Sequence, residues 1–296
     1  MRGGGGPPGC YPPLPPMPEL LKGSVVAKEM KAEMAEVISK MDKPPHLVTV
    51  LVGDDPASVT YLRYKHQDCI EIGIRSTPME LPAETTAEEL FSIMDRLNGD
   101  PDVDGFFVQI PTPDHIDDHA VMERVDPKKD VDGISPISMG KLMLGEPGFV
   151  SATPAGILEL LTRYGIPLSG ALVGIAGRGP TVGRVLANLI SLKGIDATVV
   201  LCHSRTKDMA AELSRCDIVV AAMGQPHMIT GDYIKEGAVV VDVGQERGPD
   251  GKLWGDVDRE TVDPKASWIT PHIGGVGPMT RIMLLKNVVK AAQTRS

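Results

Sequence analysis

The chain has 296 residues, of which 42% are hydrophobic and 4% aromatic, and its formal net charge is -9. This length predicts two domains, and the acidic balance argues against nucleic acids or anionic membranes as partners. No apolar run is long enough to span a membrane, and the N-terminus lacks the apolar core of a signal peptide. The four cysteines form no C-x-x-C pair, so we expect a reducing cytoplasm and no zinc or redox motif.

The first half of the chain alternates between helical and strand patterns. Residues 1–18 are rich in Gly and Pro and are expected to form a disordered lead. Residues 134–150 are expected to be an irregular or short-helical junction. From residue 19 the alternation predicts a parallel sheet covered by helices. Helices are predicted at 19–41, 58–72, 86–97 and 115–125, and strands at 47–52, 75–81 and 103–110.

A second α/β rhythm begins at residue 171, after a helix predicted at 153–164. Its strands are predicted at 171–175, 198–202, 218–221, 239–243 and 269–270, and its helices at 182–192, 207–215 and 279–292. The closing helix has no strand after it, so we expect it to pack back on the first domain. These patterns predict a first domain from residues 19–150 and 277–296, and a second from residues 151–276.

A glycine-rich turn joins a strand to a helix in the second domain. Gly177, Gly179 and Gly183 have the spacing G-x-G-x-x-x-G, one residue longer than the usual dinucleotide fingerprint. Glycines there let the backbone approach a phosphate, and the helix N-terminus favours an anion. We therefore predict a dinucleotide site, with a purely structural turn as the alternative.

The end of the next strand indicates which dinucleotide is bound. Strand 198–202 runs into His203, Ser204 and Arg205, without the carboxylate that binds the ribose in NAD sites. Guanidinium groups suit a 2′-phosphate, so the sequence favours NADP, with a solvated loop as the alternative. The predicted cofactor-binding residues are Gly177, Arg178, Gly179, Val182, Gly183, His203, Ser204 and Arg205.

Polar residues of the first domain predict an acid/base site for a flat substrate. Tyr61 and Lys65 are four residues apart and share one face of a predicted helix. Gln109 ends a predicted strand, at the edge where ligands bind in open α/β sheets, and could hydrogen-bond the Lys65 amine. Alternatively, Gln109 caps nearby backbone. Asp130 and Asp132 lack a third ligand in register, so no metal site is predicted. It is chemically more natural that one of these carboxylates accepts hydrogen bonds from a guanidine-like heterocycle.

Eight motifs follow one another along the chain. They are Tyr61-Leu-Arg-Tyr-Lys65, Val108-Gln-Ile-Pro-Thr-Pro113, Lys129-Asp-Val-Asp-Gly133, Thr153-Pro-Ala-Gly156, Gly177-Arg178, Cys202-His-Ser-Arg-Thr206, Gly255-Asp-Val257 and Gly274-Gly-Val-Gly-Pro-Met-Thr280. In this order the chain, from about residue 19 to the end, resembles the methylenetetrahydrofolate dehydrogenase/methenyltetrahydrofolate cyclohydrolase family. The resemblance implies two α/β domains flanking a cleft, of which the second is a Rossmann-type NADP-binding domain. It also implies a homodimer and a role in one-carbon metabolism and purine biosynthesis.

The resemblance also implies two reactions at one site. NADP-dependent oxidation would convert 5,10-methylenetetrahydrofolate to 5,10-methenyltetrahydrofolate, and hydrolysis would then give 10-formyltetrahydrofolate. Lys65 would be the acid/base of the hydrolytic half and Gln109 its tuning partner. Tyr61 would stack on the folate, and Asp132 would bind the pterin ring. The residues implied to line the cleft where folate meets nicotinamide are Gly275, Val276, Gly277 and Pro278.

Several positions depart from the family pattern. Gly179 replaces a serine, Val185 a proline and Ala152 a cysteine, and Pro271-His-Ile-Gly-Gly275 replaces Pro-Val-Pro-Gly-Gly. The last change places His272 close to the expected substrate cleft. The departures leave the hydrolytic residues intact and bear more on cofactor preference and affinity than on the reaction class. Three alternatives stay open: a family dehydrogenase with weak or no cyclohydrolase activity, another NAD(P)-dependent dehydrogenase, and a non-catalytic dinucleotide-binding module. No His–Asp or Lys–Asp pair evident in the second domain points to a hydroxy-acid or amino-acid dehydrogenase.

Overall fold

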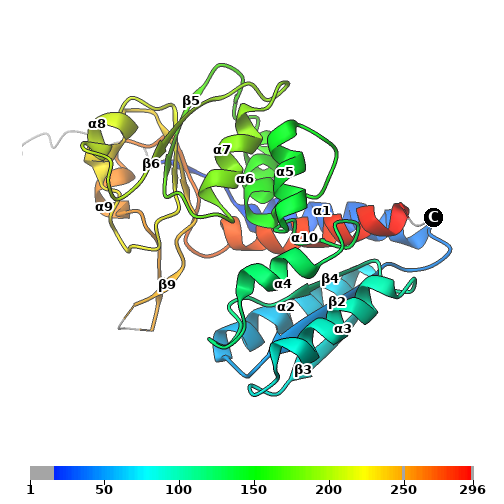
Figure 1. Cartoon of the computed structure of the whole chain (residues 1–296). Coiled ribbons are helices and arrows are strands. Elements are labelled where there is room, and N and C mark those ends of the chain that lie inside the picture. The colour runs from blue at the N-terminus through cyan, green and yellow to red at the C-terminus, as the bar shows by residue number, and fades with distance from the viewer. Residues whose placement is uncertain (1–16, 249–250, 295–296) are drawn as a thin grey trace, which may run out of the picture.

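Two parallel sheets lie on opposite sides of a pair of long helices in the computed structural model, which describes residues 17–248 and 251–294 (Figure 1). The smaller sheet has three strands in the order β3-β2-β4. They are β2 (His46–Val52), β3 (Arg75–Leu81) and β4 (Gly105–Val108). Its helices are α2 (Pro56–Ile72), α3 (Ala87–Gly99) and α4 (Asp118–Arg124). The predicted parallel sheet of the first domain is therefore confirmed.

Helix α2 ends at Gly73 as predicted, but it begins at Pro56, two residues before the predicted start at residue 58. Asp55 accepts a hydrogen bond from the backbone N–H of Ser58, which satisfies one of the free donors of the first turn. Pro56 occupies the first turn, where its missing N–H costs nothing. Gly73 ends the helix with φ 89°, a conformation that glycine adopts without a steric penalty. These caps fix the orientation of the Tyr61 and Lys65 side chains along the helix.

The larger sheet has six parallel strands in the order β1-β11-β8-β7-β5-β6. Its central strands, including β7 and β8, are fully buried, as expected for a parallel sheet covered on both faces. The strands are β1 (Glu19–Leu20), β5 (Leu172–Ala176), β6 (Thr198–Cys202), β7 (Ile218–Ala221), β8 (Val239–Asp242) and β11 (Trp268–Ile269). The helices of this part are α6 (Ala152–Arg163), α7 (Gly183–Ser191), α8 (Met209–Leu213), α9 (Arg259–Val262) and the short turn η1 (Gly231–Tyr233).

The structure differs from the sequence prediction at the start of the chain. Glu19–Leu20 is not the beginning of a helix but a strand that pairs with β11, so the larger sheet recruits it from far away in the sequence. Helix α1 (Gly23–Ser39) begins four residues later than predicted. A local apolar pattern cannot reveal this pairing, because the partner strand is distant in sequence. Five further elements were missed or left open: the hairpin β9 (Glu246–Arg247) and β10 (Leu253–Trp254), helix α5 (Pro136–Leu144) in the predicted junction, and the short helices η1 and α9.

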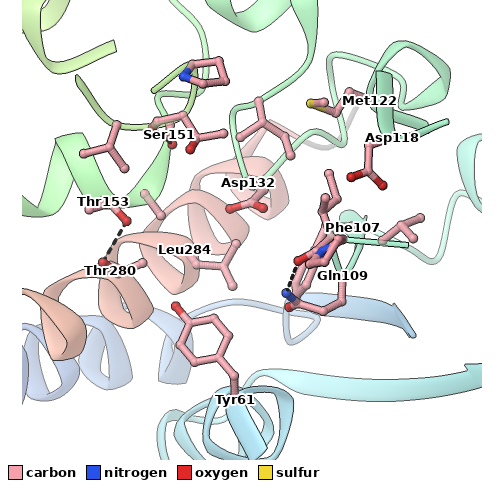
Figure 2. Close-up of a pocket in the computed structure, with 18 of the residues that line it drawn as sticks. Tyr61, Phe107, Gln109, Asp118, Met122, Asp132, Ser151, Thr153, Thr280 and Leu284 are labelled. Carbon is pink, nitrogen blue, oxygen red and sulfur yellow. Dashed lines mark hydrogen bonds between the residues drawn. The ribbon is translucent and has the colours of Figure 1, made fainter. Parts of the chain in front are cut away.

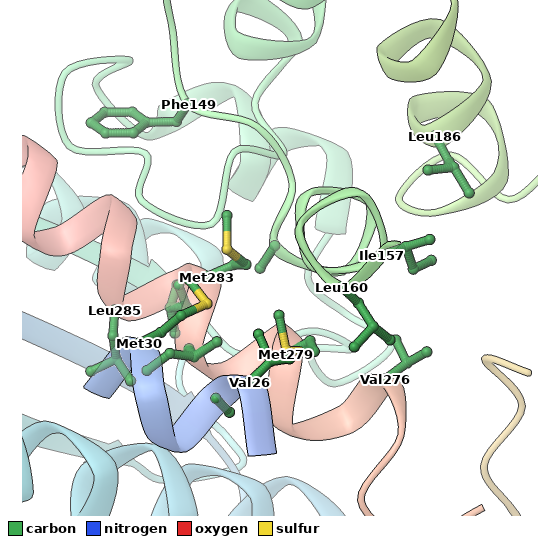
Figure 3. Packing of buried hydrophobic residues seen from close by; sticks show 14 of the residues in the cluster. Val26, Met30, Phe149, Ile157, Leu160, Leu186, Val276, Met279, Met283 and Leu285 are labelled. Atoms are coloured by element: carbon green, nitrogen blue, oxygen red, sulfur yellow. The ribbon is translucent and has the colours of Figure 1, made fainter. Parts of the chain in front are cut away.

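Helix α10 (Val276–Gln293) connects the two halves, as predicted for the closing helix. It lies beside α1 between the sheets, and it also packs on α2 and α6 (Figure 1). Its buried methionines Met279 and Met283 meet Met30 of α1 and Leu160 of α6 in one apolar cluster (Figure 3). Because these helices share one core, side chains of α10 are held at a set position relative to both sheets.

Two further sequence expectations concern the N-terminal lead and membrane-spanning helices. Most of the predicted disordered lead, residues 1–16, lies outside the described residues. Within the part of the chain that is described, none of the helices combines the length and apolar character needed to cross a membrane.

Candidate active site

A cavity of about 490 Å³ lies between α2, α10 and the loops that precede α6 and α7. Helix α2 supplies Tyr61 and Lys65 to its wall, and the carboxyl end of β4 supplies Gln109. Asp132 faces these residues from the loop before α5 (Figure 2). The structure therefore brings together all four first-domain residues that the sequence singled out.

Lys65 is buried in this wall, with only 5% of its surface exposed. Its Nζ lies 4.4 Å from the ring centroid of Tyr61 and 4.0 Å from that of Phe107, so aromatic faces surround the amine. Burial lowers the pKa of Lys65 to about 8, and the nearby Asp132 carboxylate opposes that shift. A lysine in this state exchanges a proton near neutral pH far more readily than an exposed one.

Gln109 does not make the hydrogen bond to Lys65 that the sequence suggested. Its Nε2 instead donates to the backbone carbonyl of Ile110 at 2.9 Å, as the alternative of a backbone cap anticipated (Figure 2). Its Oε1 is buried and has no hydrogen-bond partner among the described residues. The amide turns to the carbonyl next to it because that acceptor is already fixed at the strand end, whereas the Lys65 amine lies among aromatic rings. One acceptor is thereby left for a ligand.

Asp132 and Tyr61 also have shifted pKa values. Burial raises the pKa of Asp132, and the charge of Lys65 opposes this shift. The pKa of Tyr61 is raised as well, again by burial first. Asp130, only 2% exposed, accepts hydrogen bonds from the backbone N–H groups of Gly133 and Ser135 and so orders the loop that carries Asp132. Across the described residues, no three His, Cys, Asp or Glu side chains are grouped as metal ligands.

Several residues that line the cavity were not assigned a role from the sequence. Thr153 at the start of α6 and Thr280 of α10 share a hydrogen bond of 3.0 Å (Figure 2). Ser151 donates to the carbonyl of Thr181 at 3.0 Å and so ties the α6 loop to the glycine turn. Thr153 and Thr280 both belong to the family motifs found in the sequence, and this membership was the signal that could have identified them as site residues. Further lining residues come from α4 and are Asp118, His119 and Met122.

Residues 275–278 are not among those that line the cavity. They form the start of α10, where Gly275 precedes the helix and the Val276 side chain points into the core, 3% exposed. Thr280 and Leu284, four residues apart on one face of α10, line the cavity instead. The expectation for Gly275, Val276, Gly277 and Pro278 therefore stays untested by this geometry and returns below as a proposal.

The glycine turn fits a dinucleotide phosphate. Gly177 has φ 116°, and a Cβ added there would collide with the carbonyl oxygen of Ala222. A Cβ on Gly183 would collide with the carbonyl of Gly177, whereas one on Gly179 would meet no described atom within 4 Å. Backbone atoms therefore pack tightly against Gly177 and Gly183, whereas space remains beside Gly179. Helix α7 begins at Gly183 beside this turn, where the Arg184 N–H donates to the carbonyl of Gly179 at 3.1 Å, and the positive end of the helix dipole favours an anion there. Val182 also lines the cavity that holds Lys65.

The residues after β6 lie beside this turn, because β5 and β6 are neighbouring parallel strands. Arg178, Ser204 and Arg205 are exposed there. His203 Nδ1 accepts a hydrogen bond from the backbone N–H of Arg205 at 3.1 Å, which shapes the loop, and its role toward the cofactor stays a prediction. Among the described residues nothing pairs with the guanidinium groups of Arg178 and Arg205, so both can meet a phosphate.

The structure also reveals a His–Asp pair in the second domain that the sequence did not show. His272 Nδ1 lies 3.6 Å from Asp242 Oδ2, slightly beyond hydrogen-bond distance. The same Nδ1 is buried without a hydrogen-bond partner among the described residues. Neither residue lines the cavity around Lys65, so the pair does not supply the base of a hydroxy-acid dehydrogenase in that cavity.

Comparisons with known proteins agree with this arrangement. Residues 21–132 match the family model of the tetrahydrofolate dehydrogenase/cyclohydrolase catalytic domain, and residues 151–296 match that of its NAD(P)-binding domain. The Bifunctional protein FolD of Moorella thermoacetica is 48% identical over 278 residues, which is 93% of this chain and 99% of that protein.

Solved structures give the same result. The bifunctional FolD methylenetetrahydrofolate dehydrogenase/cyclohydrolase from Campylobacter jejuni has a TM-score of 0.91 and 41% identity, covering 94% of this chain and 99% of that one. The Trypanosoma brucei enzyme, solved with NADP and an inhibitor, has a TM-score of 0.88 and 35% identity over 94% of this chain and 98% of its own. The fold, the cavity and these relatives together show that the chain belongs to the tetrahydrofolate dehydrogenase/cyclohydrolase family.

Proposed function

We propose that this chain oxidises 5,10-methylenetetrahydrofolate with NADP and hydrolyses the resulting 5,10-methenyltetrahydrofolate to 10-formyltetrahydrofolate in one cavity. The observation that carries the proposal is that a buried lysine and a dinucleotide-type turn border the same space. Lys65, its pKa lowered to about 8, and Val182 of the turn both line it. An acid/base group and a cofactor loop in one cavity suit a substrate that reacts twice without leaving.

The proposed oxidation depends on positioning. Tyr61 offers its ring as a stacking surface for the folate, and the Asp132 carboxylate accepts hydrogen bonds from the pterin nitrogens. Thr280 and Leu284 close the opposite wall. Gly275, Val276, Gly277 and Pro278 start the same helix and are proposed to border the region where the folate meets the cofactor. NADP, when bound, supplies the hydride acceptor, and the chain's task is to align the folate with it and to exclude water.

The proposed hydrolysis uses Lys65 as a base. A water that attacks the cationic amidine carbon must lose a proton, and the neutral Lys65 amine accepts it. The unpartnered Oε1 of Gln109 is an acceptor that orients this water or the charged amine that results. Asp132 stabilises the protonated lysine, since its negative charge raises the pKa of Lys65. As the bond between this carbon and the pterin nitrogen breaks, the protonated Lys65 returns its proton to that nitrogen. The hydroxyl proton of the adduct leaves to solvent as the formyl C=O forms, which balances the lost positive charge of the substrate.

The pH dependence of hydrolysis tests the role of Lys65. Because the neutral amine is the active form, kcat/KM for methenyltetrahydrofolate should rise with pH and level off above the Lys65 pKa of about 8. Asp132→Asn removes the charge that raises this pKa, so the midpoint should move to lower pH. Stopped-flow absorbance of the methenyl substrate, corrected for the uncatalysed reaction at each pH, gives both midpoints. An upward shift in Asp132→Asn would contradict the electrostatic coupling.

Cofactor preference tests the two exposed arginines. Arg178→Ala combined with Arg205→Ala should raise KM for NADP by about tenfold to a hundredfold and leave KM for NAD nearly unchanged, because hydrogen bonds to a charged phosphate are lost only with NADP. Arg215→Ala is the matched control, since Arg215 is exposed in the same domain but pairs with Glu212. Initial rates with both nucleotides measure the effect. An unchanged NADP/NAD ratio would refute the 2′-phosphate assignment.

A spectral assay distinguishes this function from its closest alternative. With methylenetetrahydrofolate and NADP, reduced nicotinamide should appear without accumulation of the methenyl product. Accumulating methenyl product would instead show a family dehydrogenase with an idle Lys65 site. If neither product formed with NADP or NAD, the proposed oxidation would be wrong.

The proposal extends to assembly, domain limits and location. A homodimer is supported by the edge strand β3, whose described pairing is with β2 alone, and by exposed Val59 and Ile70 on the adjacent α2. Light scattering on the purified chain tests the proposed dimer.

The two proposed domains are residues 19–150 together with 277–296, and residues 151–276. Cys69, Cys202 and Cys216 are free thiols, which supports a reducing cytoplasm, where 10-formyltetrahydrofolate would supply purine biosynthesis.

A further inference from the structure

Two buried carboxylates lie at the carboxyl edge of the larger sheet, outside the cavity that holds Lys65. Asp256 is 0% exposed and Asp242 is 6% exposed. Asp242 ends β8, and Asp256 follows β10. Neither forms a salt bridge with a described Lys or Arg, and burial raises the pKa of Asp242. Charged groups this deep are costly unless they are fully hydrogen-bonded, so their partners show what they do.

All partners of the Asp256 carboxylate are backbone N–H groups of one loop. Oδ2 accepts from Met223 at 2.6 Å and from Gly224 at 3.2 Å, and Oδ1 accepts from Gln225 at 2.7 Å. This loop leaves the carboxyl end of β7. Three consecutive N–H groups that converge on one carboxylate have the arrangement of an anion-binding nest, filled here by the protein's own side chain. Asp256 therefore fixes the path of residues 222–225.

Asp242 in turn holds Asp256 in place. Its Oδ1 accepts from the backbone N–H groups of Gly244 and Asp256, both at 3.0 Å, and its Oδ2 accepts from that of Val257 at 3.2 Å. Glycine at 244 and at 255 makes this possible, because a Cβ at either position would collide with Asp256 or Asp242. The two carboxylates thus form one chain of hydrogen bonds through residues 222–225, 243–245 and 255–257, which we call the carboxylate relay.

The relay ends against the glycine turn. The inner side of Gly177 packs on the carbonyl of Ala222, at the base of the loop that Asp256 holds. The backbone N–H of Ala222 also donates to the carbonyl of Ala176, the last residue of β5. Any shift of the 222–225 loop must therefore move the turn that carries Gly177 and Arg178, at the edge where parallel α/β sheets bind nucleotides.

We propose that Asp242 and Asp256 are positioning residues for the dinucleotide: they hold the 222–225 loop beneath the glycine turn and so set the shape of the cofactor site without touching the reacting atoms. The inference rests on the proposed NADP site. It assigns cofactor affinity to side chains that lie far from the glycine motif in sequence. The relay has no contact with Lys65, so it serves the oxidation and not the hydrolysis.

Asp256→Asn tests the relay with little change in shape. One carboxylate oxygen becomes an NH₂ group, and in either amide orientation at least one of the three backbone N–H groups then faces a donor. We expect the NADP dissociation constant, measured by fluorescence titration, to rise at least about tenfold, with a similar rise in KM for NADP. Hydrolysis of methenyltetrahydrofolate, which needs no cofactor, should stay within about twofold of wild type, and this also reports that the variant is folded. Asp242→Asn should act in the same direction.

Asp217→Asn is the matched control. Asp217 also accepts a backbone N–H bond, from Leu172 at 2.7 Å, but it precedes β7 at the opposite end of the sheet. It should leave NADP binding unchanged. An unchanged dissociation constant in Asp256→Asn, an equal loss in Asp217→Asn, or an equal loss of hydrolysis in Asp256→Asn would each overturn the proposal.

Hydrogen exchange on the wild-type chain gives a test that needs no variant. The amides of Met223, Gly224 and Gln225 lie in a loop, yet the relay predicts that they exchange slowly, and more slowly still with NADP bound. Rapid exchange of these amides without NADP would overturn the relay even if Asp256→Asn proved insoluble. If wild type showed slow exchange but bound no NADP, the relay would stand and the proposed function would fail.

Discussion

Lys65→Met should abolish most of the hydrolytic activity while hydride transfer persists in part. Methionine is a similar length to lysine and suits the aromatic surroundings of a side chain that is 5% exposed, so α2 should keep its position. The lost proton acceptor corresponds to a fall of about 10² to 10⁴ in the hydrolysis rate. The oxidation needs alignment more than a base, so its kcat should fall much less.

The measurement follows the two products separately on one enzyme preparation. With methylenetetrahydrofolate and NADP, the variant should accumulate the methenyl compound, whereas wild type should not. Lys28→Met on the exposed face of α1 is a suitable control, because it makes the same chemical change away from the cavity. Hydrolysis that survived in Lys65→Met would remove Lys65 from the mechanism and make Asp132 the next buried cavity residue to test as the proton carrier.

Gly177→Ala should have the opposite selectivity, with the oxidation lost and the hydrolysis retained. The added Cβ would collide with the carbonyl oxygen of Ala222, and alanine at φ 116° is strained even where there is space. The β5–α7 turn must therefore move away from the path of the phosphates. We expect NADP affinity to fall at least about 100-fold, equivalent to about 2.7 kcal/mol.

Gly179→Ala separates this steric effect from a general intolerance of the turn. A Cβ at Gly179 would meet no described atom within 4 Å, so the change should cost no more than about threefold in NADP affinity. Fluorescence titration of both variants, with hydrolysis as the check on folding, decides the comparison. Equal losses of NADP affinity at both positions would mean that binding depends on the backbone flexibility of the turn and not on the collision with Ala222.

Local sequence was sufficient wherever the chemistry depended on neighbours along the chain. The spacing of Tyr61 and Lys65 placed both on one face of a helix, because the helical repeat fixes that relation. Gly73 marked the end of this helix, whereas its start at Pro56, capped by Asp55, lies two residues before the predicted one. Gly177 and Gly183 identified a strand–turn–helix unit. Glycine is needed at both positions because a Cβ there would collide with a neighbouring backbone carbonyl.

Tertiary structure decided the relations between distant segments. The pairing of β1 with β11, the direction of the Gln109 amide and the bond between Thr153 and Thr280 depend on groups that only folding brings together. The same holds for the loop that Asp256 orders, because backbone N–H groups carry no signature in the sequence. The amino-acid sequence by itself therefore determined the alternation of the main helices and strands, the family and the main acid/base candidate, but not short elements such as β1 and β9. The position of α10 between two sheets, the cavity it closes and the shift in the Lys65 pKa arise from packing and burial, which exist only in the folded chain.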